Sequence, residues 1–180
     1  HRWCLERNLT MMGTSDAHDP MGMIYDFSRA EHRPLTLVLA KERTEAAIRE
    51  ALFDRRTVVY WKNSLIGRPE FLRPIFEESI SIKNPEIRMA PRGRAQFQIH
   101  NASQMDYELE LREKVEGFDV PRSLTLYADR TVLFAVRSLS SEASGEKRLS
   151  IPYTVNNLKI TPEEGLSVSL SFPIRFVESD

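Results

Sequence analysis

The sequence has 180 residues, of which 41% are hydrophobic and 28% are charged, and its formal net charge is -1 with a pI near 6.5. This length allows one ordinary domain or two small ones with a real core. The nearly neutral charge gives no long-range field to attract polynucleotides or an anionic membrane, so neither nucleic acid nor a membrane is an expected partner.

The ends and the cysteine content say little about the compartment. Cys4 is the single cysteine and cannot form an intramolecular disulfide. No apolar run approaches the roughly 20 residues that span a bilayer. The chain starts with His1 in place of Met, and its first residues resemble the middle of a helix. We therefore expect a fragment whose native amino terminus, and any signal peptide, lie upstream.

The segment 1–20 is expected to contain a helix end and a buried strand. Residues 3–8 look like the last turns of a helix, with Asn8 suited to the left-handed conformation that closes one. The apolar run 9–14 predicts a strand of a parallel sheet, followed by the polar stretch 15–20. In helix-flanked parallel sheets, catalytic residues commonly lie at such strand ends.

Strand and helix patterns then alternate up to residue 82. Buried strands are predicted over 35–40 and 57–61, and a second helix over 69–79. Thr44 is placed to cap a helix over 45–54, whose inner stripe would be Ile48, Ala51 and Leu52. Alternation predicts an α/β layer or barrel over 1–82, but three strands are too few to complete one.

The apolar period changes to two beyond residue 82, which predicts an all-β domain over 83–180. Phe97 and Ile99 alternate with polar residues, and Tyr107 is expected to point inward with Leu109 and Leu111. About seven strands in a hundred residues is the density of an immunoglobulin-like sandwich. These strands are expected over 96–100, 107–111, 124–127, 131–137, 149–155, 158–160 and 166–172.

Metal-competent side chains gather only at Asp16, His18 and Asp19, directly after the first predicted strand. A carboxylate and an imidazole two residues apart suit zinc, iron or manganese. The alternative is that the two aspartates cap a turn and that His18 is a loop histidine. Spacing alone favours the second interpretation.

The stretch Gly13-Thr14-Ser15-Asp16-Ala17-His18 resembles the last metal-binding motif of the polymerase and histidinol phosphatase (PHP) superfamily of hydrolases. The segments 33–43 and 48–52 are similar to the closing strand and helix of such proteins. The resemblance covers the predicted α/β segment 1–82 and implies an incomplete PHP-type barrel segment. The sandwich is similar to carboxyl-terminal domains of some secreted or periplasmic members, which implies a bacterial periplasmic or exported parent.

The resemblance implies that Asp16 and His18 are ligands of a divalent metal cluster, of Zn, Mn or Fe, in the intact parent. Such a cluster would activate a water for hydrolysis of a phosphomonoester or phosphodiester small molecule. The other ligands of the family, an amino-terminal His-x-Asp-x-His type motif and middle Glu and His residues, have no counterpart in this sequence. The chain alone is therefore expected to be inactive, with no catalytic residue of its own and with weak metal binding or none. Its incomplete sheet edges favour a homo-oligomer.

The remaining candidates have plainer explanations. Those considered are a terminal ligand at His1, a thiol nucleophile at Cys4 that is expected in the core, a phosphate contact by His32 with Arg29, an exposed strand histidine at His100, a pocket wall at Tyr60 and Trp61, and an accidental glycosylation match at Asn101.

A second hypothesis makes the chain a non-catalytic module. The sandwich would then bind a glycan, a protein or another subunit, or serve a structural role, with the segment 1–82 as support. An exposed aromatic patch on the sandwich would favour binding. Because Tyr107 is expected to be buried, the sequence favours a structural role for the sandwich.

Overall fold

Two units make up the chain in the computed structural model, which describes residues 1–26, 28, 32–84 and 86–177. Unit 1 combines His1–Ile75 with Asn157–Leu166, and unit 2 combines Phe76–Asn156 with Ser167–Asp180. No helix in the described part of the chain has the length and apolar character needed to cross a membrane.

Unit 1 has a small antiparallel sheet at its centre. The strands β1 (Leu35–Val38), β2 (Thr57–Trp61) and β3 (Ser64–Gly67) pair in that order, and β3 also pairs in parallel with Leu158 and Lys159 at the end of β11. The predicted strands at 35–40 and 57–61 are confirmed, but their antiparallel pairing is not the parallel arrangement that alternation suggested. β3 was missed because only two of its four residues, Leu65 and Ile66, are large and apolar.

Unit 1 also contains short helices. They are α1 (Arg2–Glu6), α2 (Met21–Ile24), α3 (Glu45–Phe53) and the first part of α4 (Pro69–Ser79). Thr44 caps α3 as expected, its hydroxyl accepting the N–H of Ala47 at 3.2 Å, and Asn8 has the left-handed φ of 52° after α1. The expected inner stripe was partly wrong, because Ala47 and Ala51 are buried while Ile48 is 42% exposed.

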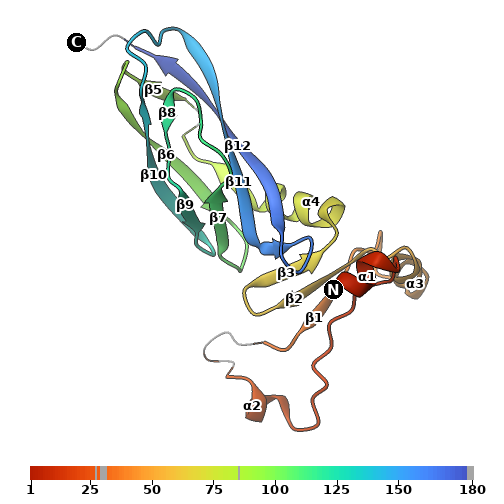
Figure 1. Ribbon diagram of the computed structural model, residues 1–180. Coiled ribbons are helices and arrows are strands. Elements are labelled where there is room, and N and C mark those ends of the chain that lie inside the picture. Colours follow the sequence, from red (N-terminus) through yellow and green to blue (C-terminus); the bar gives the residue numbers. More distant parts are fainter. Residues whose placement is uncertain (27, 29–31, 85, 178–180) are drawn as a thin grey trace. The chain divides into compact units, whose positions relative to one another are not determined.

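Unit 2 is a two-layer β-sandwich, seen as two facing layers of arrows in Figure 1. One sheet has the order β4-β6-β10-β8, and the strands of the other lie in the order β9-β7-β11-β12-β5. The strands are β4 (Ile80–Ile82), β5 (Ile87–Met89), β6 (Arg94–Asn101), β7 (Tyr107–Leu111), β8 (Phe118–Asp119), β9 (Ser123–Leu126), β10 (Arg130–Ser138), β11 (Glu146–Lys159) and β12 (Gly165–Phe176).

The predicted all-β domain is confirmed in its strand content and alternation. Burial in β6 and β12 alternates almost residue by residue, as a half-buried strand requires. The predicted strands over 149–155 and 158–160 form a single long strand, β11. Three aromatic rings pack together between the sheets: the centroid of Phe97 lies 4.7 Å from that of Phe172 and 5.4 Å from that of Phe134.

Tyr107 and Tyr153 are both fully buried in unit 2, each with its hydroxyl bonded. Tyr107 shares a 2.8 Å hydrogen bond with Ser79, and Tyr153 donates to the carbonyl of Pro121 at 2.9 Å. Burial raises the pKa of Tyr153 to about 12, because the phenolate would lose its hydration.

Alkaline pH should therefore destabilise the sandwich through Tyr153. The folded-state pKa of Tyr153 lies above the ordinary value of 10. The stability that the protonated side chain contributes is therefore fully present below pH 10 and is lost as the pH rises towards 12. In Tyr153→Phe we expect a shallower loss of stability over this range, with a cost of about 1 kcal/mol at neutral pH from the missing hydrogen bond. Denaturant unfolding at several pH values, with absorbance at 295 nm, measures both effects. Tyr127→Phe, at a 52% exposed site, is the control, and identical pH slopes in the two variants would contradict the assignment.

Candidate functional site

The segment 9–14 is not a strand, so the prediction of a strand there was wrong. Side-chain hydroxyl groups nevertheless fix it to the rest of unit 1. Thr10 donates to the carbonyl of Leu52 at 2.7 Å, and Thr57 donates to the carbonyl of Met11 at 2.8 Å. Met11 is buried beside them. Hydroxyl groups thus supply the hydrogen bonds that a sheet ladder would have supplied, so an apolar run looks like a strand without pairing as one.

Gly13 brings this segment close to β2. Thr36 both receives the N–H of Gly13 at 2.9 Å and donates to its carbonyl at 3.0 Å. A Cβ at Gly13 would lie only 2.5 Å from Cγ1 of Val59. The glycine of the sequence motif therefore has a packing reason in this fold, because no larger residue fits without displacing Val59.

Asp16 and His18 follow this anchored segment and point into solvent. The His18 Nε2 atom lies 3.8 Å from the Asp16 Oδ1 atom, and the side chains are 88% and 94% exposed, respectively. Asp16 has a left-handed φ of 48°, a conformation that aspartate tolerates. Asp19 is also exposed. Within the described ranges no group of three or more His, Cys, Asp or Glu side chains could hold a metal ion.

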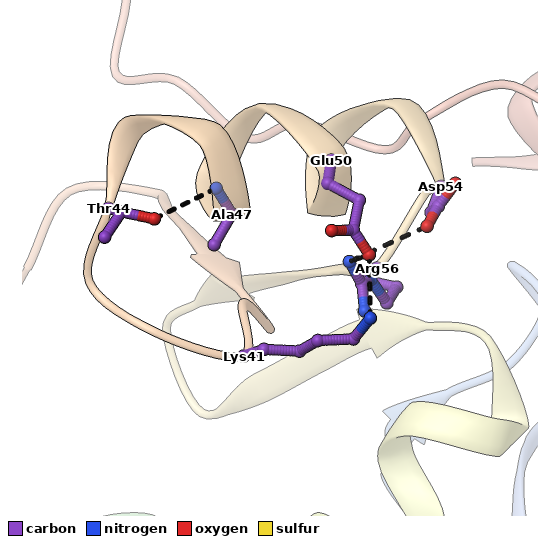
Figure 2. Close-up of polar contacts among 6 residues, drawn as sticks. All are labelled: Lys41, Thr44, Ala47, Glu50, Asp54 and Arg56. Atoms are coloured by element: carbon purple, nitrogen blue, oxygen red, sulfur yellow. Dashed lines mark hydrogen bonds and ion pairs between the residues drawn. The ribbon is translucent and has the colours of Figure 1, made fainter.

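A polar cluster gathers around Glu50 of α3, with Lys41 from the loop before this helix and with Asp54 and Arg56 from the segment between α3 and β2 (Figure 2). Lys41 Nζ and Arg56 Nη2 both donate to the same Glu50 oxygen, at 3.0 and 2.8 Å, and Arg56 also lies 3.6 Å from Asp54. These contacts lower the pKa of Glu50. The largest cause is the hydrogen bond from Lys41, followed by the positive charge of Lys41 and the hydrogen bond from Arg56. The cluster ties α3 to the segments that connect it with β1 and β2 and has the character of a structural network.

The other candidates of unit 1 show no catalytic arrangement. Cys4 is half-buried and not in the core, which corrects the expectation, because α1 has no buried residue. The His32 ring packs at a tilt against the Tyr60 ring, with 4.2 Å between their centroids, and its nitrogens lie 2.8 and 3.2 Å from two backbone carbonyls. Its proposed companion Arg29 lies outside the described residues. His1 is half-buried at the start of α1, and Trp61 is 44% exposed.

The candidates on the sandwich are structural. Asn101 is fully buried and donates to the carbonyls of Met105 and Leu126 at 2.8 and 2.9 Å, so its side chain is not displayed for glycosylation in the folded protein. His100 is half-buried, not exposed, and its Nδ1 atom lies 3.3 Å from the Thr131 hydroxyl.

Residues 80–171, more than half of the chain, match a protein family described as an Ig-like domain (DUF5001). The chain belongs to this family. The matched span contains all the strands from β6 to β11, in agreement with the two-layer sandwich. No curated protein matches the chain.

Among solved structures, the chain is similar to a two-domain protein from Bacteroides vulgatus ATCC 8482 described as containing a predicted PHP-like metal-dependent phosphoesterase. The two are 34% identical with a TM-score of 0.82, over 95% of this chain and 48% of the other, so the chain spans about half the length of that protein. Weaker likenesses join 56% of this chain to WR4, a C. elegans MSP family member (13% identity, TM-score 0.38), and to a protein of unknown function from Porphyromonas gingivalis W83 (15%, 0.34). These matches cover 98% and 49% of those two chains.

Two surface hollows were not foreseen from the sequence. One, of about 430 Å³ in unit 1, is lined by Thr10, Met12, Glu45, Ile48, Arg49, Leu52 and Phe53. Another, of about 630 Å³ in unit 2, lies around residues 111–122. The exposed positions of Met12 and Phe53 carry no periodic signal, so only the folded chain reveals that they lie together.

Replacing Gly13 by alanine should destabilise unit 1 by about 1–3 kcal/mol, because Val59 is a β-branched strand residue that cannot easily rotate away. Gly22→Ala is the matched control, since its Cβ meets nothing within 4 Å and alanine favours α2. Both tryptophans, Trp3 and Trp61, lie in unit 1, so denaturant unfolding followed by tryptophan fluorescence reports on that unit. Equal stability of the two variants would contradict the close approach.

Acid should weaken unit 1 through Glu50. A carboxyl group whose folded-state pKa is lowered contributes stability above its ordinary value of 4.5, and this is lost as the pH falls through the folded-state value. Glu50→Gln should therefore lower the melting temperature at pH 7 and have little effect at pH 2, as measured by thermal unfolding with tryptophan fluorescence. Glu6→Gln, at an exposed site of α1, is the control. A pH-independent effect of Glu50→Gln would exclude this ionic contribution.

Proposed function

We propose that this chain is the carboxyl-terminal part of a metal-dependent phosphoesterase, in which unit 1 contributes to the α/β domain and the Ig-like sandwich is an accessory domain. The observation that carries the proposal is the 34% identity, over 95% of the chain, with the two-domain Bacteroides protein. The motif residues 13–18, which resemble the PHP metal-binding motif, give independent support from the sequence.

Asp16 and His18 are the proposed metal ligands, and their positions are compatible with this role. Two ligand atoms bound about 2.1 Å from one tetrahedral metal lie about 3.4 Å apart. The observed separation of 3.8 Å, between two exposed side chains, needs only a small rotation to reach that value. A divalent ion held there would lower the pKa of a bound water and offset charge on a phosphoester oxygen.

The role of this chain is to position these two side chains. The hydroxyls of Thr10 and Thr57 and the close contact of Gly13 with β2 fix the segment that precedes them. Two protein ligands alone leave most of a metal's coordination sphere to water, so the chain is expected to bind metal weakly and to have no activity by itself.

Apolar surface on unit 1 also supports a phosphoesterase domain as its neighbour. Met12 is 61% exposed, Ile48 42% and Phe53 75%, and all three line the 430 Å³ hollow. Exposed apolar groups that gather in this way mark an interaction surface. Met12 lies in the same segment as the proposed ligands, so packing of an α/β phosphoesterase domain here would also surround Asp16 and His18.

A test of the metal site uses the 180-residue chain titrated with Zn²⁺ or Mn²⁺. We expect weak binding whose affinity falls at least tenfold in the Asp16→Ala/His18→Ala double variant. Mutation of residues that only hydrogen-bond to metal ligands already lowers metal affinity about tenfold or more, and loss of the ligands themselves should have at least this effect. Asp129→Ala, which removes an exposed carboxylate from the sandwich, is the control. Isothermal titration calorimetry measures the affinity. Unchanged binding in the double variant would exclude Asp16 and His18 as ligands.

Activity is tested separately with bis-p-nitrophenyl phosphate and Mn²⁺. The chain alone should give no turnover above the metal blank, whereas a polypeptide that joins it to an amino-terminal phosphoesterase domain should hydrolyse the ester and lose this activity on Asp16→Ala. Turnover by the chain alone would contradict its proposed inactivity. Undiminished turnover by the Asp16→Ala form of the longer protein would contradict the proposed role of this residue.

A further inference from the structure

The hollow of about 630 Å³ on unit 2 has the dimensions of a small-molecule site. It is lined by Leu111, Arg112, Glu113, Lys114, Val115, Phe118, Asp119, Val120, Arg122 and Leu139. Ligand pockets in proteins commonly enclose about 300–1,000 Å³. The residues come from the end of β7, the turn that follows it, β8, the segment between β8 and β9, and the residue after β10.

Backbone hydrogen bonds hold the walls of this hollow in place. The N–H of Leu111 donates to the carbonyl of Arg122 at 2.7 Å, and that of Leu139 donates to the carbonyl of Gly117 at 2.9 Å. Gly117 has a left-handed φ of 76°, so the turn depends on glycine at this position. The site is therefore formed before any ligand arrives, which reduces the entropy cost of binding.

Half of the lining is apolar. Leucine and valine side chains and the Phe118 ring supply this surface, and Leu139 is 54% exposed although it is a large hydrophobic residue. Water against such a surface is released when an apolar ligand covers it. The hollow can thus bind the non-polar part of a ligand.

The charged half has an excess of cations. Arg112, Lys114 and Arg122 stand against Glu113 and Asp119, and none of these five takes part in an ion pair within the described chain. Four arginines elsewhere, Arg2, Arg49, Arg56 and Arg175, do have carboxylate partners. A guanidinium group presents two parallel N–H donors that match a carboxylate.

The neighbouring strand is too short to favour a peptide ligand. β8 has two residues and pairs with β10, so it offers little edge for an added strand.

We propose that this hollow binds a small carboxylate-bearing molecule whose apolar surface lies on Leu111, Phe118 and Leu139 while its carboxylate meets Arg112 or Arg122. The alkyl chain of a fatty acid and the C–H face of a uronic acid both supply this chemistry.

The experiment is an NMR titration of the 180-residue chain with octanoate and with glucuronate. Two comparison probes separate the two properties. Octyl glucoside has an alkyl group but no carboxylate, and inorganic phosphate has negative charge but no apolar surface. We expect amide shifts confined to residues 111–122 and 139 for at least one carboxylate, with binding at least tenfold tighter than that of either comparison probe. The carboxylate that binds identifies the source as lipid-like or sugar-like.

Charge removal completes the test. Arg112→Gln/Arg122→Gln should weaken carboxylate binding at least tenfold, since a charged hydrogen bond lost from such a site has about this effect on affinity. Arg130→Gln/Arg148→Gln, at exposed strand positions outside the hollow, should leave it unchanged. Amide spectra that otherwise match the wild type show that the variants are folded. The proposal is overturned by absent binding, by shifts elsewhere on the chain, by comparison probes that bind as well, or by equal affinities of the two double variants.

Discussion

The packing of three aromatic rings between the sheets of unit 2 is the constraint on which its other features depend. Phe97 and Phe134 come from neighbouring strands of one sheet, and Phe172 comes from the other and meets Phe97 edge to face. Rings of this size each bury about 150–250 Å² and fix the sheet separation. Once the inward positions are set, the outward ones follow from the pleat, and short turns such as that around Gly117 must connect strands at fixed distances. The preformed walls of the hollow at residues 111–122 are a consequence of this geometry.

The sandwich was largely predictable because one physical signal dominates it. Burial every second residue in β6, β7 and β12 leaves the same period in the sequence, and Tyr107 and Phe97 lie where that period places them. At Asn101 this periodicity does not determine burial. A polar residue among apolar neighbours could be exposed or could serve buried carbonyls, and only its contacts with Met105 and Leu126 decide between the two.

Unit 1 was predicted less well because its apolar runs are short and carry little periodic information. The run 9–14 has the composition of a buried strand, but Thr57 and Thr36 satisfy backbone groups of Met11 and Gly13 by side-chain hydrogen bonds, a distinction that composition does not contain. Three buried strands interspersed with helices suggested a parallel sheet, whereas the short turn between β2 and β3 makes that pair an antiparallel hairpin. The sequence did identify Asp16 and His18 as neighbours, and the structure explains the adjoining glycine by its approach to Val59. Their role as metal ligands stays a prediction.

The division of the chain also limits how these units can be separated or recombined. Unit 1 needs residues 157–166, which comprise the end of β11, the turn after it and the start of β12, and which lie inside the span of the Ig-like family match. This returning segment supplies the partner of β3 and the carboxylate of Glu163 that pairs with Arg2. A gene fusion that grafts only His1–Ile75 onto another scaffold would leave β3 with an unpaired edge. One that transplants the continuous sandwich segment would carry along residues 157–166, which belong to unit 1. Because of this hairpin, the two units are expected to be inherited together during domain shuffling.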